Sequence, residues 1–281
     1  MATARSVKQT FIALEVSEGQ GMRVRRAIPS PDLPNLTPFI ISLIISGAIN
    51  HEDFLGNKGT IGPGGIQVMT AGRGIMHSEQ TKRADPKLDP PDSIVEAIQL
   101  WVDLPHNLRY TAPGYLGIKA SKIPVLKIDG GRVTVRIIAG ESHGKKAKYN
   151  LTHAPMWYFD ISMKPGGRIQ QIIQKGWNAF LYTLHGNIFV DGAPRIGKFC
   201  TVEFGGEGDY VEVFVPDNEE EGARFILLAG MPLDQKIVHY GPFVLSDEDE
   251  VRKAISDFRL GMNGFERALT WESDISKSLG H

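Results

Sequence analysis

Two pairs of possible metal ligands lie close together in the first half of the chain. His51 and Asp53 form one pair, and His77 and Glu79 form the other. Residues two apart on a β-strand project from the same face of a sheet, so each pair can point into one cavity. An imidazole and a carboxylate on one face suit an iron, manganese, zinc or copper ion, with open positions for a substrate or dioxygen. The same spacing also occurs on strands that face solvent, and there it binds nothing.

The elements that must position these pairs are short strands separated by glycines. Both pairs lie in the glycine-rich stretch 47–79. The glycines at 59–65 divide KGTIGPGGIQV into two short strands around a tight turn, and those on either side of Arg73 allow a sharp bend before His77. The preceding run IISLIISGAI, residues 40–49, has no period of two, which is typical of a strand covered on both faces.

The rest of the chain also predicts β-structure. We expect strands at 11–18 and 21–28 joined by a turn at 19–21, then a proline-rich connection at 29–39, a polar surface loop at 80–93, and a partly helical segment at 106–130. Strand patterns broken by Gly, Pro, Asp and Asn recur to residue 233 at the spacing of a sandwich or barrel. With 281 residues the chain is long enough for two domains, which we place at 1–128 and 129–281.

One helix is expected near the C-terminus. Ser246 is a candidate cap, the acidic residues that follow it suit the first turn, and Gly261 suits the end. Its apolar residues recur at helical spacing and predict a face packed on the β-core. They are Val251, Ala254, Ile255 and Phe258.

Composition limits the partners. Lys and Arg number 31 against 32 for Asp and Glu, so we expect no direct binding to nucleic acid, and any role at DNA would pass through a protein. The most apolar run, Phe39–Ile49, is about half the length needed to cross a bilayer, so we expect no membrane span. Cys200 is the single cysteine and favours a reducing intracellular compartment. The isolated histidines are predicted not to be ligands; they are His106, His143, His153, His185 and His239.

The chain resembles the pirins, a bicupin group of the cupin superfamily. The resemblance rests mainly on TAGRGIMHSE at 70–79 and on the block from GPFV at 241 to NGFERA at 268. It extends through GMRVRRAI, GAINHEDFLGNKGTIGPGG, IQLWVDLP, IIAGES and LLAGMPL. It implies an all-β fold of two cupin-type antiparallel β-barrels packed together, with a C-terminal helix and a non-haem Fe(II) in the N-terminal barrel only. It also implies two functions: quercetin 2,3-dioxygenase activity on a flavonol, and iron-dependent regulation of transcription through nuclear protein partners.

The resemblance further implies an iron bound by three histidines and one glutamate. His77 and Glu79 match two of these ligands, and Glu79 would also be the possible catalytic base. The other two belong to a His-x-His segment of the type FPDHPHRGFETV, whereas this chain has only IISLIIS between Phe39 and Gly47. We expect a deletion of about thirty-five residues, enough for two or three strands, and hence an incomplete N-terminal barrel. His51 and Asp53 could complete a set by spacing alone, but the corresponding histidine is not a ligand in the family.

Three explanations of this gap remain open, in decreasing order of preference. The sequence is a splice form or a gene-model error of an ordinary pirin, a shortened pirin that binds metal weakly, or a metal-free protein-interaction scaffold. The expected partners are accordingly a flavonol-like small molecule or a transcription factor, in the cytoplasm or the nucleus. Because lost strands expose edges and apolar surface, we predict that the N-terminal half is the less stable half.

Overall fold

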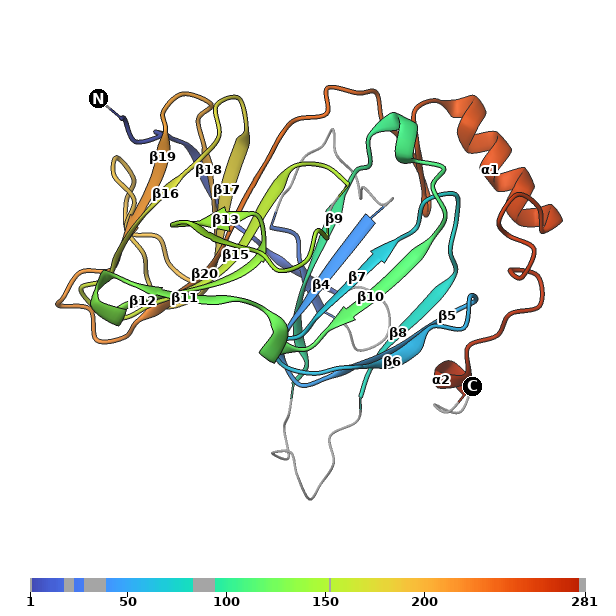
Figure 1. Ribbon diagram of the computed structural model, residues 1–281, viewed down its shortest axis with the longest axis horizontal. Helices are drawn as coiled ribbons and strands as arrows, with labels where there is room; N and C mark the ends of the chain where they lie inside the picture. Colours follow the sequence, from blue (N-terminus) through green and yellow to red (C-terminus); the bar gives the residue numbers. More distant parts are fainter. Residues whose placement is uncertain (1, 18–22, 28–38, 83–93, 152, 278–281) are drawn as a thin grey trace, which may run out of the picture. The chain divides into compact units, whose positions relative to one another are not determined.

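The chain folds into two compact units, each assembled from two separate segments. The structure is a computed structural model that describes residues 2–17, 23–27, 39–82, 94–151 and 153–277 (Figure 1). The seven-strand unit comprises Met1–Asp32 and Ile123–Leu233, and the site unit comprises Leu33–Lys122 and Asp234–His281. The units are therefore not the two consecutive halves expected from the sequence, because the first and last segments each join the other half. The turn expected at 19–21, the proline-rich connection and most of the loop at 80–93 lie outside the described residues.

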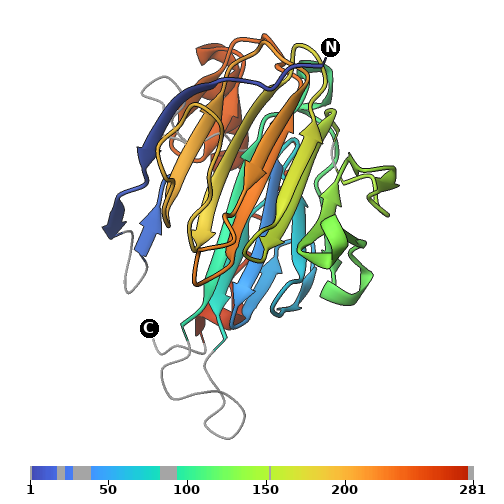
Figure 2. The ribbon, with the colours of Figure 1, turned by 90° about the vertical axis from the view of Figure 1, so that its left-hand side faces the viewer.

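The seven-strand unit is built on one antiparallel sheet (Figure 2). Every second residue of its central strands points into an apolar core, as Val135, Phe159 and Phe225 show, each fully buried. This period of two is the pattern expected for a strand with one face on the core. In order across the sheet, the strands are β1 (Val7–Ile12), β18 (Cys200–Phe204), β17 (Asn178–His185), β20 (Ala223–Gly230), β15 (Met156–Met163), β12 (Val133–Ala139) and β11 (Val125–Ile128).

Three short two-stranded sheets complete the described part of this unit. The pair β16 (Arg168–Ile172) and β19 (Tyr210–Phe214) contributes Ile169, Val211 and Val213 to the same core. The remaining pairs are β2 (Glu15–Ser17) with β3 (Arg23–Arg25) and β13 (Glu141–Ser142) with β14 (Lys145–Lys146).

The site unit has two antiparallel sheets. Consecutive residues of β4 are buried, with Ile40, Ile41 and Leu43 at 5, 0 and 0% exposure, so the prediction of a strand covered on both faces is confirmed. The four-stranded sheet has the order β10 (Gly114–Ile118), β7 (Ile66–Thr70), β4 (Phe39–Ser46) and β9 (Glu96–Val102). The three-stranded sheet has the order β6 (Lys58–Ile61), β5 (Ile49–Asp53) and β8 (His77–Thr81).

The segment expected to be partly helical is mostly not helical. Gly114–Ile118 forms a strand along β7, where Leu116 is opposite Val68 and Gly117 is opposite Gln67. Two glycines in five residues hide the strand pattern from the sequence, and only pairing with β7 reveals it. The helical part is limited to the single 3₁₀ turns η1 (His106–Leu108), η2 (Ala120–Lys122) and η3 (Asp129–Gly131).

Helix α1 (Glu248–Leu260) confirms the expected helix, but its cap differs. Asp247 is the N-cap: its carboxylate accepts a hydrogen bond from the Glu250 backbone N–H at 2.8 Å. Ser246 lies one residue before the N-cap, and its hydroxyl instead accepts a hydrogen bond at 2.6 Å from the buried Arg109. The helix ends at Gly261, whose φ of 63° is in the left-handed region that glycine adopts without strain.

Two smaller elements complete the site unit. The hairpin β21 (Val238–Tyr240) and β22 (Phe243–Leu245) supports α1, because Phe258 packs against Phe243 with ring centroids 6.3 Å apart. The four-residue helix α2 (Asp274–Lys277), too short to be recognised in the sequence, lies on β5 and β8.

Candidate functional site

The structure brings the two predicted ligand pairs onto one face of one sheet. β5 and β8 run antiparallel, with His51 opposite Glu79 and Asp53 opposite His77. Residues two apart share a face, and so do residues directly opposite each other in the ladder. The two pairs, separated by more than twenty residues in the sequence, therefore form a single cluster.

The other face of this sheet is covered by α2. The Ser276 hydroxyl lies 3.1 Å from that of Ser78 and accepts a hydrogen bond from the Gln80 side chain at 2.9 Å. The Glu52 carboxylate accepts one from the Ile275 backbone N–H at 3.0 Å. The predicted ligands thus point away from α2, toward side chains of the four-stranded sheet.

Glu79 is held by two glutamines of that four-stranded sheet. Gln67 on β7 donates an amide hydrogen bond to one carboxylate oxygen, and Gln99 on β9 donates to the other at 3.1 Å. The Trp101 indole N–H donates to the side-chain oxygen of Gln99, Oε1, at 2.6 Å. This hydrogen bond orients the Gln99 amide so that its N–H₂ points toward Glu79. Both carboxylate oxygens are therefore hydrogen-bond acceptors for side chains of this chain.

His51 is paired with Tyr115 on β10. The Tyr115 hydroxyl lies 2.5 Å from His51 Nε2. Burial lowers the pKa of His51, although the nearby Asp53 charge opposes this, while burial raises the pKa of Tyr115. The imidazole is then neutral and the phenol protonated, and the two groups share one hydrogen bond whose donor depends on the imidazole tautomer. Gly59 makes room for the ring, because a Cβ there would lie 3.0 Å from Nε2.

Asp53 and His77 have different surroundings. The Asp53 carboxylate is buried and accepts hydrogen bonds from the backbone N–H groups of Leu55 and Asn57, at 2.9 and 3.1 Å, and from the Asn57 side chain at 2.8 Å. Asp53 therefore organises the turn between β5 and β6. His77 stands at the exposed start of β8.

These four side chains do not fit a resident iron. In the described part of the chain, no three His, Cys, Asp or Glu residues are grouped so that they could hold a metal ion. An open catalytic site needs about three protein ligands. Here the Asp53 carboxylate holds a turn, the Glu79 carboxylate accepts two amide hydrogen bonds, and the buried His51 Nε2 is hydrogen-bonded to the Tyr115 hydroxyl. Only His77 is uncommitted, and one ligand binds a metal weakly.

The glutamines and the tyrosine that complete the cluster were not anticipated. Gln67, Gln99 and Tyr115 lie on three strands of the four-stranded sheet, and each reaches a residue of the predicted pairs. Their sequence neighbours give them no distinguishing pattern. The alternation in EAIQLWVDLP does place Gln99 and Trp101 on one face, but which face meets β8 depends on pairing between distant strands.

Comparison with known proteins supplies the family. Residues 3–102 match the family model described as Pirin, and residues 158–264 match the Pirin C-terminal cupin domain. The chain is 36% identical to human pirin, with 98% of this chain and 99% of that protein covered. This chain belongs to the pirin family. A pirin-like protein of Solanum lycopersicum is also 36% identical, with 96% of each chain covered.

Solved structures agree with the pirin assignment. A quercetin 2,3-dioxygenase from Acinetobacter baumannii superposes with a TM-score of 0.80 at 26% identity, covering 92% of this chain and 98% of the other. The predicted all-β bicupin fold is confirmed. The alignment with human pirin runs over 302 positions, more than the 281 residues of this chain, so this chain lacks residues that its relative has. Among the described residues, every helix is too short or too polar to cross a bilayer.

Proposed function

We propose that this chain is a pirin-family bicupin without a resident iron, and that it acts by binding a protein partner. The observation that carries the proposal is the state of Glu79, whose two oxygens accept hydrogen bonds from Gln67 and Gln99. In the family that the chain resembles, this carboxylate is an iron ligand. Here its closest partners are amides, and the segment that would supply two further histidines is absent.

The partner class follows from what the chain retains. Pirins are associated with regulation of transcription through protein partners, and that role needs a folded surface rather than an open metal position. With 31 basic and 32 acidic residues, the chain has no excess of positive charge to attract nucleic acid. We therefore expect a metal-free co-regulator or scaffold of the cytoplasm or nucleus, which contacts DNA only through another protein.

Iron content and quercetin turnover test the proposal together. The purified chain is incubated with Fe(II) under anaerobic conditions and passed through a desalting column. Its iron is then counted by plasma mass spectrometry, and quercetin loss in air is followed by absorbance. We expect much less than one iron per chain and turnover no faster than the buffer. Stoichiometric iron together with turnover would overturn the proposal.

A second candidate is flavonol dioxygenation by a weakly held metal. It is supported by the 26% identity to a quercetin 2,3-dioxygenase over nearly the full length of both chains. His77 and Glu79 would be the two residues that this chain offers, with a third ligand missing. In the same experiment this candidate predicts quercetin turnover that rises with added Fe(II) and disappears after desalting.

The origin of the gap is tested separately. Sequencing the transcript across the codons for Phe39 to Gly47 shows whether an exon is omitted. A matched protein carrying an inserted FPDHPHRGFETV-type segment should then retain iron through desalting. If it does, the inserted histidines restore the site, and the metal-free state belongs to the short form alone.

A further inference from the structure

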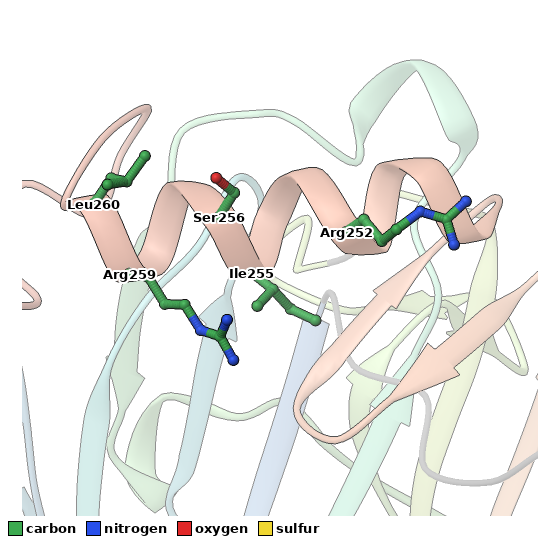
Figure 3. Close-up of a pocket in the computed structure, with 5 residues that line it drawn as sticks. All are labelled: Arg252, Ile255, Ser256, Arg259 and Leu260. Atoms are coloured by element: carbon green, nitrogen blue, oxygen red, sulfur yellow. The ribbon is translucent and has the colours of Figure 1, made fainter.

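Helix α1 exposes a set of side chains that the predicted ligand pairs do not use. Arg252, Ile255 and Arg259 follow one side of the helix at intervals of three and four residues. In Figure 3, Ile255 lies between the two arginines. Together with Ser256 and Leu260 they line a surface hollow of about 410 Å³, and we call these five residues the α1 stripe.

The α1 stripe is rigidly presented. Val251 is buried at 6% exposure and Phe258 packs against Phe265 with ring centroids 5.5 Å apart, so the adjacent side of the helix is anchored. Asp247 caps the first turn and Gly261 closes the last. A surface fixed in this way loses little conformational entropy when a partner binds.

The charges on the helix leave one arginine uncommitted. Arg252 forms ion pairs with Asp249 and Glu248 at 2.5 and 3.4 Å, and Lys253 pairs with Asp257 at 3.0 Å. Arg259, in contrast, has no acidic residue of the described chain within ion-pair distance. Its planar guanidinium is exposed and can bind a carboxylate through two hydrogen bonds.

Apolar surface continues beyond this arginine. Leu260 is 63% exposed and Leu269 is 62% exposed. The Leu269 side chain lies beside Gly261, 2.8 Å from where a Cβ on that glycine would be, so it lies at the end of the helix that carries Leu260. An apolar patch beside an unpaired cation is typical of a surface that another protein covers.

We propose that the α1 stripe binds an acidic amphipathic segment of a partner protein. An apolar side chain of that segment would lie on Ile255 and Leu260, and a carboxylate would bind Arg259. A second copy of this chain suits the surface poorly, because a two-fold contact would set two copies of the stripe together, each with two arginines and no carboxylate. This inference rests on the protein-binding role proposed above, to which it adds a surface and a partner chemistry.

A labelled synthetic helix with a leucine face edged by glutamates tests the inference by fluorescence anisotropy. We expect saturable binding that weakens with salt, and a loss of at least about tenfold in affinity for Arg259→Glu. The Arg259→Glu protein should instead bind the same peptide with lysines in place of the glutamates. Lys119→Glu makes the same charge change at an exposed residue just before η2. It is the matched control and should bind the peptide as tightly as the unmodified protein does.

Each other outcome is decisive. No binding, equal binding by Arg259→Glu, or an equal loss in Lys119→Glu overturns the inference. So does a dimer of the unmodified chain, seen by analytical ultracentrifugation, that Arg259→Glu abolishes, because the occupant is then a second copy. Iron and quercetin turnover are measured on the same preparations: if both are present and the peptide still binds through Arg259, the inference stands while the metal-free function fails.

Discussion

Both units of this chain are built from antiparallel sheets, but the side chains in their interiors differ. In the seven-strand unit the inward positions are apolar, as in Val135, Phe159 and Phe225, all fully buried. In the site unit, by contrast, the space between the two sheets contains His51, Glu79 and their hydrogen-bonding partners. The first interior is stabilised mainly by burial of apolar surface, which needs no particular partner. The interior of the site unit depends instead on each polar group having its own hydrogen-bond partner.

The difference shows what remains when a site loses its ligand-bearing segment. A polar interior without a metal must satisfy its donors and acceptors internally, because an unpaired buried polar group costs about 1–3 kcal/mol. Glu79 with its two glutamines and His51 with Tyr115 meet that requirement. We infer that the site unit is stable without iron, but less stable than an apolar barrel.

Truncating the apolar interior should have the largest effect. Phe225→Ala removes a fully buried ring from β20 and should lower the free energy of unfolding by about 3–5 kcal/mol. Urea denaturation followed by circular dichroism measures it. The control Ile172→Ala, at a side chain 65% exposed, should change stability by less than about 0.5 kcal/mol. A loss below about 1 kcal/mol for Phe225→Ala would show that this interior is not the better packed one.

Neutralising a buried ion pair of the site unit should have a smaller effect. Arg109 and Asp103 are 1 and 7% exposed and lie 2.7 Å apart, and Asp103 also accepts from Gln235. Asp103→Asn keeps one acceptor but removes the charge, so we expect a loss of about 1.5–3 kcal/mol. The same denaturation curves test it, with the exposed Asp249→Asn as control. An unchanged free energy of unfolding in Asp103→Asn would mean that solvent reaches the hydrogen bonds of Arg109, Asp103 and Gln235.

Hydrogen exchange compares the units directly. Amides of β5 and β8 should exchange at least about tenfold faster than those of β15, β17 and β20, because β5 and β8 contribute no fully buried apolar side chains and local opening is easier there. Mass spectrometry of peptic fragments resolves the two sets. Equal protection would break the comparison and contradict the prediction that the N-terminal half is the less stable one.

The smallest effect is expected at the candidate site itself. Glu79→Gln keeps an acceptor for one glutamine but removes the charge that strengthens both hydrogen bonds, so the loss of stability should be about 1 kcal/mol. Iron content should stay unchanged, and that measurement separates a hydrogen-bond acceptor from a ligand. A fall in bound iron would show that Glu79 is a metal ligand after all.

The sequence predicted elements and faces better than it predicted partners. The unbroken run in β4 and the helical spacing of Val251 and Phe258 are local patterns, and both predictions are confirmed. The pairing of His51 with Tyr115 depends instead on which strands meet across the unit. Likewise, the sequence favours Ser246 as the helix cap. Its hydroxyl instead accepts a hydrogen bond from Arg109, more than a hundred residues earlier in the chain. Such contacts have no local pattern from which they could be predicted.

The exchange of terminal segments between the units sets the order in which the chain can fold during synthesis. β1 is translated long before β18, its partner, so it can enter the seven-stranded sheet only after β18 is made. The site unit needs Asp234–His281, which is translated after all the strands of the seven-strand unit, so its two sheets stay without α1 and α2 until that segment is made. Closing such long loops is slow, and the waiting strands are exposed meanwhile. The unfinished chain therefore exposes unpaired strand edges until these late segments are made, and we expect chaperones to bind it at that stage.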